Sequence, residues 1–299
     1  MDTTNKGLAL ALFGALVIVP DTLFMRISGL GATQMVAWRG LLQAAVLLTL
    51  WIVLSRRHRA DVAALATGTG VLAALLQASN AALFATGIAI APVAVVLFAV
   101  AMVPLVAALF GVIFLGDRIE KATLIAAFVV LLGIGLSVSA EFTTEGSALL
   151  GALCGLAVAV SLSGSFTLFR ARPDLSIFLT VGLGASLSGV VAFLLTDSMT
   201  QTQGWLPAIW VTGAVILPIS FTTMNLASRY TVAANVSLVL LLETVLGPIV
   251  VWIGVGEAVG PRGLIGGAIV VVTLAVYLWD QRRRALSRVT RRPIRGSAL

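Results

Sequence analysis

Ten apolar segments, each of about twenty residues, follow one another along a chain of 299 residues with only short connections between them. A segment of this length crosses the hydrocarbon core of a bilayer as an α-helix, which satisfies its own backbone polar groups. The sequence therefore predicts an all-α polytopic membrane protein with ten transmembrane helices. We place these helices at residues 7–26, 33–54, 62–90, 92–115, 119–139, 146–169, 175–195, 205–227, 232–254 and 262–280.

Composition excludes several other classes of protein. With 60% hydrophobic and 10% charged residues and a mean hydropathy of +1.10, the chain does not fit a soluble globular domain. Cys154 and His58 are the only cysteine and histidine, too few for a zinc, haem or iron–sulfur site. They also form no nucleophile–base pair, and Lys6 and Lys121 have no P-loop around them. We therefore expect no metal, no cofactor, no enzyme activity and no built-in ATPase.

Lysine and arginine residues are distributed unequally between the two sides of the predicted bundle. Sixteen lie on the side of both termini: Lys6, Arg56, Arg57, Arg59, Arg118, Lys121, Arg170, Arg172, Arg229, Arg282, Arg283, Arg284, Arg288, Arg291, Arg292 and Arg295. Arg26 and Arg262 lie on the other side, and Arg39 lies inside the second segment. The positive-inside rule then places both termini in the cytoplasm and the loop 140–146 outside. We expect the basic tail, 282–299, to be disordered near anionic lipid head groups, without binding nucleic acid.

The two halves of the chain share one layout. Pro92–Asp117 and Val232–Glu257 are both apolar segments with an internal break signal, and Gly116-Asp117 falls on Gly256-Glu257. Ten spans in two copies give five helices per copy, and an odd number forces the second copy to insert upside down. We predict one repeat over 1–142 and an inverted repeat over 143–281. Inverted repeats are typical of secondary transporters that work by alternating access.

The endings Phe114-Leu115-Gly116-Asp117 and Val255-Gly256-Glu257, with the ten short-looped helices, carry a family resemblance. The chain resembles the drug/metabolite transporter (DMT) superfamily with its paired EamA repeats, and is most similar to YddG-like amino-acid exporters. The resemblance implies a multi-pass exporter of aromatic or neutral amino acids in the cell inner membrane. The ninth helix departs from the family's Glu-Pro pair: it has Glu243-Thr244, with Pro248 four residues later.

Polar residues inside the apolar segments predict the substrate site. At about 1.5 Å of rise per residue, Asp21, Arg39, Gln77 and Asn80 fall in one layer of the membrane. Glu243 falls near the middle of the ninth helix, where an ionised carboxylate needs a partner, water or a proton. Asp21 and Glu243 are thus candidate proton carriers. Both also fit a structural role. Asp21 would form an ion pair with Arg39 that fastens the first span to the second, and Glu243 would accept a hydrogen bond.

An amino-acid ligand needs donors for its carboxylate, acceptors for its ammonium group and an apolar wall. The predicted donors are Arg39, Asn80 and Gln77, and the predicted acceptors are Asp21 and Glu243. The predicted wall consists of Trp38, Phe84, Phe98 and Met102, and the small polar stretch with Ser163 and Ser165 is a candidate lining. Each wall or serine position also fits simple packing. The predicted hinges are the prolines within spans: Pro20, Pro104, Pro218 and Pro248.

Three functions remain open at this stage. The first is a secondary transporter of small metabolites, most specifically an amino-acid exporter. The alternative is a channel-like protein, or one that exports lipids or drugs such as quaternary amines. A membrane enzyme is third. As partners we expect a small-molecule substrate and membrane lipids, and a chain able to work as a monomer.

Overall fold

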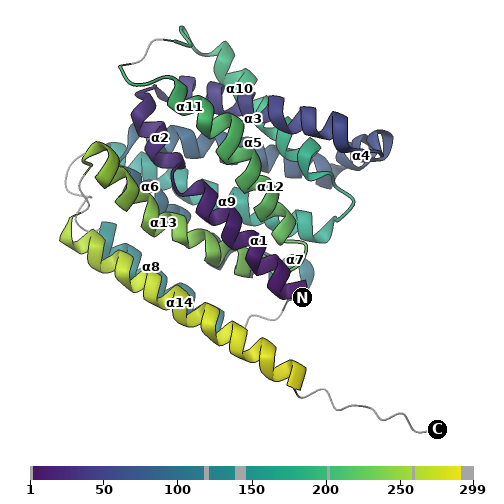
Figure 1. The fold of residues 1–299 in the computed structure, drawn as a ribbon, viewed down its shortest axis with the longest axis vertical. Helices are drawn as coiled ribbons and strands as arrows, with labels where there is room; N and C mark the ends of the chain where they lie inside the picture. Colours follow the sequence, from purple (N-terminus) through teal and green to yellow (C-terminus); the bar gives the residue numbers. More distant parts are fainter. Residues whose placement is uncertain (1–2, 118–120, 139–145, 201–202, 258–259, 291–299) are drawn as a thin grey trace.

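The computed structural model describes residues 3–117, 121–138, 146–200, 203–257 and 260–290, and their regular elements are helices (Figure 1). The first part contains α1 (Thr3–Ile18), α2 (Asp21–Ser28), α3 (Ala32–Leu54), α4 (His58–Leu65), α5 (Gly68–Ile90), α6 (Val93–Val100), α7 (Val103–Leu115) and α8 (Lys121–Val138). The second part contains α9 (Gly146–Ala171), α10 (Ile177–Leu194), α11 (Pro207–Val211), the π-helix η1 (Thr212–Ile216), α12 (Leu217–Ala227), α13 (Ala233–Val255) and α14 (Pro261–Thr290).

Eight helical segments among the described residues are long and apolar enough to cross a membrane. They are Asn5–Ser28, Ala32–Leu54, Gly68–Ile90, Val93–Leu115, Leu149–Ala171, Ile177–Leu194, Pro207–Ala227 and Ala233–Val255. A shorter apolar stretch, Leu124–Gly133, lies in α8. The chain is therefore a multi-pass membrane protein with an all-helical fold. The total of ten spans, which adds α8 and α14, stays a prediction.

Proline marks the interruptions of three predicted spans. Pro20 lies in the turn between α1 and α2, and Pro104 is the second residue of α7, just after the break that ends α6. Pro218 is the second residue of α12 and follows the π-helical turn. Pro248 differs, because α13 runs through it without interruption. Its missing N–H still leaves the carbonyl of Thr244 without its usual helical partner.

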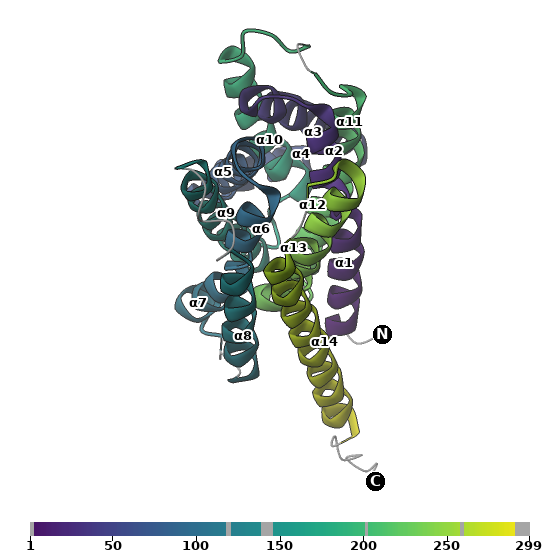
Figure 2. The same cartoon turned by 90° about the vertical axis from the view of Figure 1, so that its left-hand side faces the viewer.

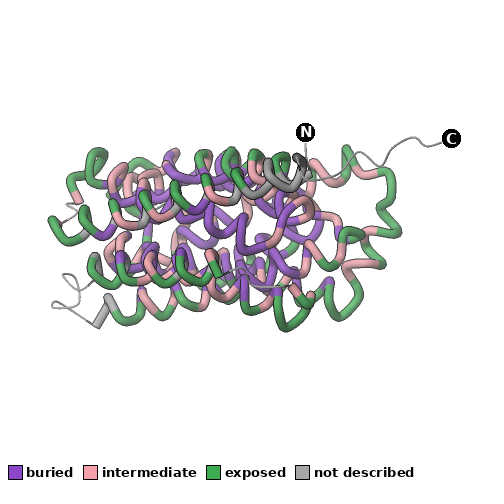
Figure 3. The backbone as a smooth tube through the Cα atoms, turned by 90° about the horizontal axis from the view of Figure 1, so that it is seen from below, coloured by how far each residue is buried: buried purple, intermediate pink, exposed green. Residues whose placement is uncertain are grey.

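The helices pack in a bundle whose buried residues lie in the interior (Figure 3). α3 packs against α10, α5 against α9, and α1 against α12. α8 and α14 pack on each other along one edge of the bundle (Figures 1 and 2). Glycine permits a close crossing of α3 and α10: a Cβ on Gly40 of α3 would lie 2.6 Å from the carbonyl oxygen of Ala185 and 2.7 Å from Cα of Gly189 in α10. Such backbone contact is a common way for helices to associate within membranes.

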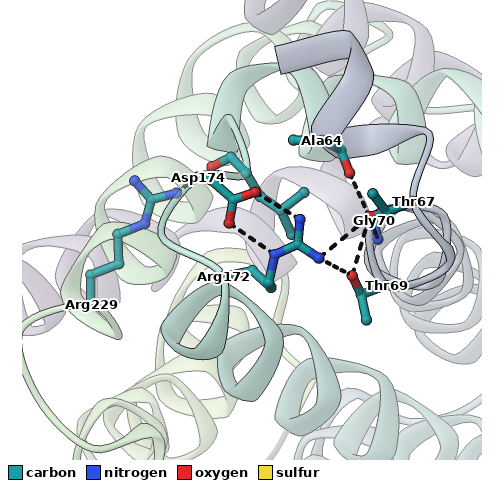
Figure 4. Close-up of polar contacts among 8 residues, drawn as sticks. Ala64, Thr67, Thr69, Gly70, Arg172, Asp174 and Arg229 are labelled. Atoms are coloured by element: carbon teal, nitrogen blue, oxygen red, sulfur yellow. Dashed lines mark hydrogen bonds and ion pairs between the residues drawn. The ribbon is translucent and has the colours of Figure 1, made fainter. Parts of the chain in front are cut away.

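Polar contacts between loops define the two ends of the bundle. At the N-terminal end, where α1 begins, Arg172 is hydrogen-bonded to Asp174 at 2.9 and 2.7 Å and donates to Thr69 and Thr67 at the start of α5 (Figure 4). Arg229 donates to the carbonyl oxygen of Leu175. The hydrogen bond from Arg172 lowers the pKa of Asp174. These contacts join the loop that follows α9 to the start of α5 and to the segment that follows α12.

The opposite, distal end is closed by the long connection between α10 and α11. Gln34 and Trp38 of α3 donate to the carbonyl oxygens of Ser198 and Met199 at 2.6 and 2.8 Å. The backbone N–H of Trp205 donates to the carbonyl oxygen of Ile27 at 2.9 Å. The connection is therefore held against both α2 and α3.

The C-terminal region corrects one expectation. Residues 282–299 were predicted to be disordered, but α14 continues to Thr290, and residues 291–299 lie outside the described part. Arginine, alanine and leucine have high helix propensity, and extending an existing helix avoids the cost of nucleation. The absence of apolar periodicity in this stretch indicated only that it has no packing partners. It did not indicate disorder, because an existing helix can continue without such partners.

Candidate functional site

A buried ion pair joins the first two predicted spans. Nη1 of Arg39 in α3 lies 2.7 Å from Oδ2 of Asp21, the first residue of α2. Asp21 is placed there because the chain turns at Pro20 and starts a new helix at this depth. The side chains are 7% and 0% exposed, so solvent screens this pair very little. Oδ1 of Asp21 has no hydrogen-bond partner among the described residues.

A second carboxylate lies in the same region. Glu243, in the middle of α13, is 3% exposed, and its Oε1 has no hydrogen-bond partner within the described structure. Nε2 of Gln77 in α5 is also buried without a described partner. A native protein rarely leaves such groups unpaired, so each needs an explanation by water, an ion or a ligand.

Arg39, Gln43, Gln77, Asn80 and Glu243 line one cavity among the helices. Its volume is about 40 Å³, which has room for roughly three water molecules. Apolar residues from both halves complete the lining: Ile18, Ala81, Phe84, Val100, Leu162, Phe166, Val181, Ala185, Leu217, Phe221, Met224 and Leu240. Five polar or charged residues and twelve apolar ones thus line the cavity, and a ligand larger than this volume requires the surrounding helices to move apart.

Comparison with known proteins agrees with this membrane fold. Residues 5–139 match the model of the EamA-like transporter family. This match supports membership of the chain in the drug/metabolite transporter superfamily. One protein known from a crystal structure has the same fold, with a TM-score of 0.70 at 20% identity over 93% of this chain and 98% of that chain. No curated protein matches the sequence.

The cavity contains part of the predicted site. Arg39, Gln77, Asn80, Phe84 and Glu243 line it directly. Asp21 lies behind Arg39 and holds its guanidinium group. These residues come from four helices: α2, α3, α5 and α13. They lie close together in the structure, as their similar estimated depths in the membrane had predicted for Asp21, Arg39, Gln77 and Asn80.

The other predicted site residues lie outside the cavity lining. Trp38 faces Trp210, with ring centroids 5.8 Å apart, and its indole N–H is bonded at the distal end. Phe98 packs in a separate buried cluster that includes Tyr277, and Met102 packs on the edge of the main core.

The two serines also have packing partners. The hydroxyl of Ser163 donates to the carbonyl oxygen of Val103 at 3.0 Å, and that of Ser165 donates to Oδ1 of Asn225 at 3.5 Å. They join α9 to α7 and α12. This is the packing alternative that the sequence had left open for small polar residues.

Gln43 also lines the cavity, and the sequence carries a signal for it. It follows Arg39 by one helical turn, and this i, i+4 spacing places both on one inward face. Other lining residues were missed. Phe166 and Phe221 gave no comparable signal, because each is one apolar residue among many in an apolar helix. Only the crossing of α9 and α12 in the fold brings these rings to the cavity.

Proposed function

We propose that this EamA-like transporter is a secondary transporter of small metabolites that exports neutral and aromatic amino acids by alternating access, as YddG-like proteins do. The observation that carries this proposal is the cavity lined by Arg39, Glu243, three amide side chains and a set of apolar residues. A free amino acid presents a carboxylate, an ammonium group and a side chain to such a site.

The charges of the site match the two ends of a zwitterion. Nη1 of Arg39 is bonded to Asp21, and its other guanidinium nitrogens have no described hydrogen bond while the residue lines the cavity. They are available to a carboxylate, which guanidinium binds in a forked geometry. Oε1 of Glu243 is available to an ammonium group. One ligand with both groups then pairs with Arg39 and with Glu243 at once, and Glu243 gains a partner inside the membrane, where unpaired charge is costly.

Aromatic and aliphatic residues supply the remaining contact surface. Phe84, Phe166 and Phe221 line the cavity together with Leu162 and Leu240. Burial of apolar surface contributes roughly 25 cal/mol per Å². This wall therefore favours amino acids with apolar or aromatic side chains over those with a charged side chain.

The inverted repeat belongs to the same proposal, and helix packing supports it. If the halves 1–142 and 143–281 are equivalent, α1 corresponds to α9, α3 to α10, α5 to α12 and α8 to α14. The contact of α1 with α12 then has its counterpart in that of α9 with α5. The contact of α3 with α10 joins two corresponding helices, and so does the contact of α8 with α14, so the symmetry maps each of these contacts onto itself. Such a network is expected of two similar halves related by a pseudo-two-fold axis.

The proposed orientation has both termini in the cytoplasm of a cell with an inner membrane. A reporter that is active only in the cytoplasm should work when it is fused after Arg283 and fail when it is inserted in the loop 140–146. The opposite pattern would overturn both the orientation and the inverted-repeat argument.

Counterflow in proteoliposomes tests the substrate. The purified chain, loaded with an unlabelled amino acid, should accumulate the same labelled amino acid transiently and with saturation. The matched amine without a carboxylate and the N-acetylated amino acid should compete poorly, because each lacks one charge. Equal transport of all three would reject the zwitterion site, and unsaturable flux would favour a channel.

The alternative, export of quaternary amines or similar drugs, is favoured by one observation. Among the described buried residues, Asp21 and Glu243 supply two carboxylates and Arg39 one guanidinium group. A cation would bind Glu243 and need no contact with Arg39. Transport of a labelled quaternary amine that survives in an Arg39→Gln variant would support this alternative over amino-acid export.

A further inference from the structure

Two ion pairs, one at each end of the bundle, lie outside the cavity. The distal ion pair consists of Arg26 and Glu257, with Nε of Arg26 3.0 Å from Oε2 of Glu257. Nη2 of Arg26 also donates to the carbonyl oxygen of Ala91 at 2.7 Å, and Oε1 of Glu257 accepts from the backbone N–H of Val93 at 3.1 Å. This cluster joins α2, the turn between α5 and α6, and the segment that follows α13.

The N-terminal ion pair consists of Arg170 and Asp117. Both terminal nitrogens of the Arg170 guanidinium group donate to the two carboxylate oxygens of Asp117. The backbone N–H of Asp117 donates to the carbonyl oxygen of Gly111 at 3.0 Å, which fixes the carboxylate next to the end of α7. The side chains are 28% and 24% exposed, close to the 23% and 34% of the distal pair.

The four residues occupy similar places at the ends of their helices. Arg26 lies in the last turn of α2, the end of the first span, and Arg170 lies in the last turn of α9. Asp117 and Glu257 each follow a glycine that ends its helix in the left-handed conformation, Gly116 at φ 65° and Gly256 at φ 76°. The same cap therefore aims a carboxylate at the same arginine position, once at each end.

Each ion pair crosses between the halves. Arg26 belongs to the first half and Glu257 to the second, whereas Asp117 belongs to the first and Arg170 to the second. Both pairs are formed in this structure, and the cavity has a volume of about 40 Å³. Separation of the halves at one end would widen the path to the cavity and would pull apart the charges located at that end.

We propose that the distal and N-terminal ion pairs are the two gates of the transport cycle, which break alternately and hold the chain occluded when both are formed. This inference rests on the proposed alternating access and concerns its control, whatever the substrate. The pairs are at the bundle surface, so each is weak enough to break in a cycle. Their equivalence keeps the two open states close in free energy, as reversible access from either side requires.

Thiol accessibility of the cavity tests the gates without any substrate. We would place a cysteine at Ala81, which lines the cavity, in a Cys154→Ala background. Labelling rates with a membrane-impermeant maleimide are then measured separately from each side of the membrane. Asp117→Asn should raise labelling from the side of the N-terminal end, and Glu257→Gln from the distal side. The expected increase is about three- to tenfold, the effect of losing one partly exposed, hydrogen-bonded ion pair.

The controls separate gating from misfolding. The reversed pair Arg170→Asp with Asp117→Arg should return labelling to the parent rate, because it restores the attraction. Asp174→Asn removes a carboxylate at the same end that pairs with Arg172 within one loop, and it should leave labelling unchanged. Equal increases from both sides, or none from either, would overturn the gate proposal. Failure to transport amino acids alongside side-specific labelling would refute the substrate and leave the gates standing.

Discussion

Breaking the Asp21–Arg39 ion pair should destabilise the protein more than removing it whole. The side chains are 0% and 7% exposed, so the attraction between them is not screened by solvent. Loss of one partner of a buried pair costs about 3–5 kcal/mol, because the other charge remains buried and unpaired. Asn keeps an oxygen that can accept from Arg39, so we expect about 3 kcal/mol for Asp21→Asn and a similar cost for Arg39→Gln.

The double variant distinguishes this account from simple loss of contacts. Asp21→Asn with Arg39→Gln removes both charges, so it should cost less than either single variant: about 2 kcal/mol, against about 6 kcal/mol for the sum of the single effects. Thermal unfolding in detergent, followed by the folded fraction on size exclusion, measures the four members of the cycle. At roughly 2–4 °C per kcal/mol for a chain of this size, each single variant should melt about 6–12 °C below the parent.

The exposed pair Arg172–Asp174 is the matched control for this cycle. The hydrogen bond from Arg172 lowers the pKa of Asp174, so any stability that it supplies is present above the unfolded pKa and lost as the pH falls through the folded one. At neutral pH a cycle on this pair should show coupling within the error of measurement, because the pair is in water. Additive effects at Asp21 and Arg39 would refute the argument from burial. The stable double variant should still fail to transport, since the ligand's carboxylate loses its donor.

Three further predictions concern the same cavity and the helices around it. Asn80→Ala and Gln77→Ala should each lower counterflow at least tenfold while the melting temperature stays near that of the parent, because both amides line the cavity; poor folding with normal transport per folded molecule would make them packing groups. Glu243→Gln keeps the shape and loses the titration, so it should abolish coupling to a pH gradient yet retain exchange if Glu243 carries protons, and an unchanged response would remove it from that role. Gly40→Val should prevent stable folding, because its Cβ would lie 2.6 Å from a backbone oxygen and 2.7 Å from Gly189, and a yield equal to the parent's would refute the close crossing.

The sequence predicted the helices well because membrane spans are dictated by local composition. The breaks near Pro20 and Pro104 were also predictable, since proline lacks the N–H that a helix interior needs. The continuous helix at Pro248 and the helical extension through 282–290 were not, because packing and propensity outweighed the break and disorder signals.

The site was only partly predictable. Polar residues in lipid have to face inward, and this rule located Arg39, Gln77, Asn80 and Glu243. Apolar lining residues such as Phe166 cannot be recognised in this way, because an apolar residue can face either lipid or the cavity. Which one it faces depends on how the helices cross. The match of Arg26 to Arg170 was hidden in the sequence, since arginine near the end of a span is an ordinary feature of membrane proteins.

The glycine crossing of α3 and α10 has a mechanical consequence. At Gly40 and Gly189 the two backbones touch with no side chains interlocked between them, so this point can act as a fulcrum for a scissor-like rotation. A rotation of about 15° there would carry the far end of α3, some 20 Å along the helix, by roughly 5 Å. The Cα atom of the adjacent Arg39 would move by only about 1 Å in the same rotation. The residue that we propose to bind the ligand therefore lies next to the rotation axis and moves little, whereas the ends of the bundle move apart and together.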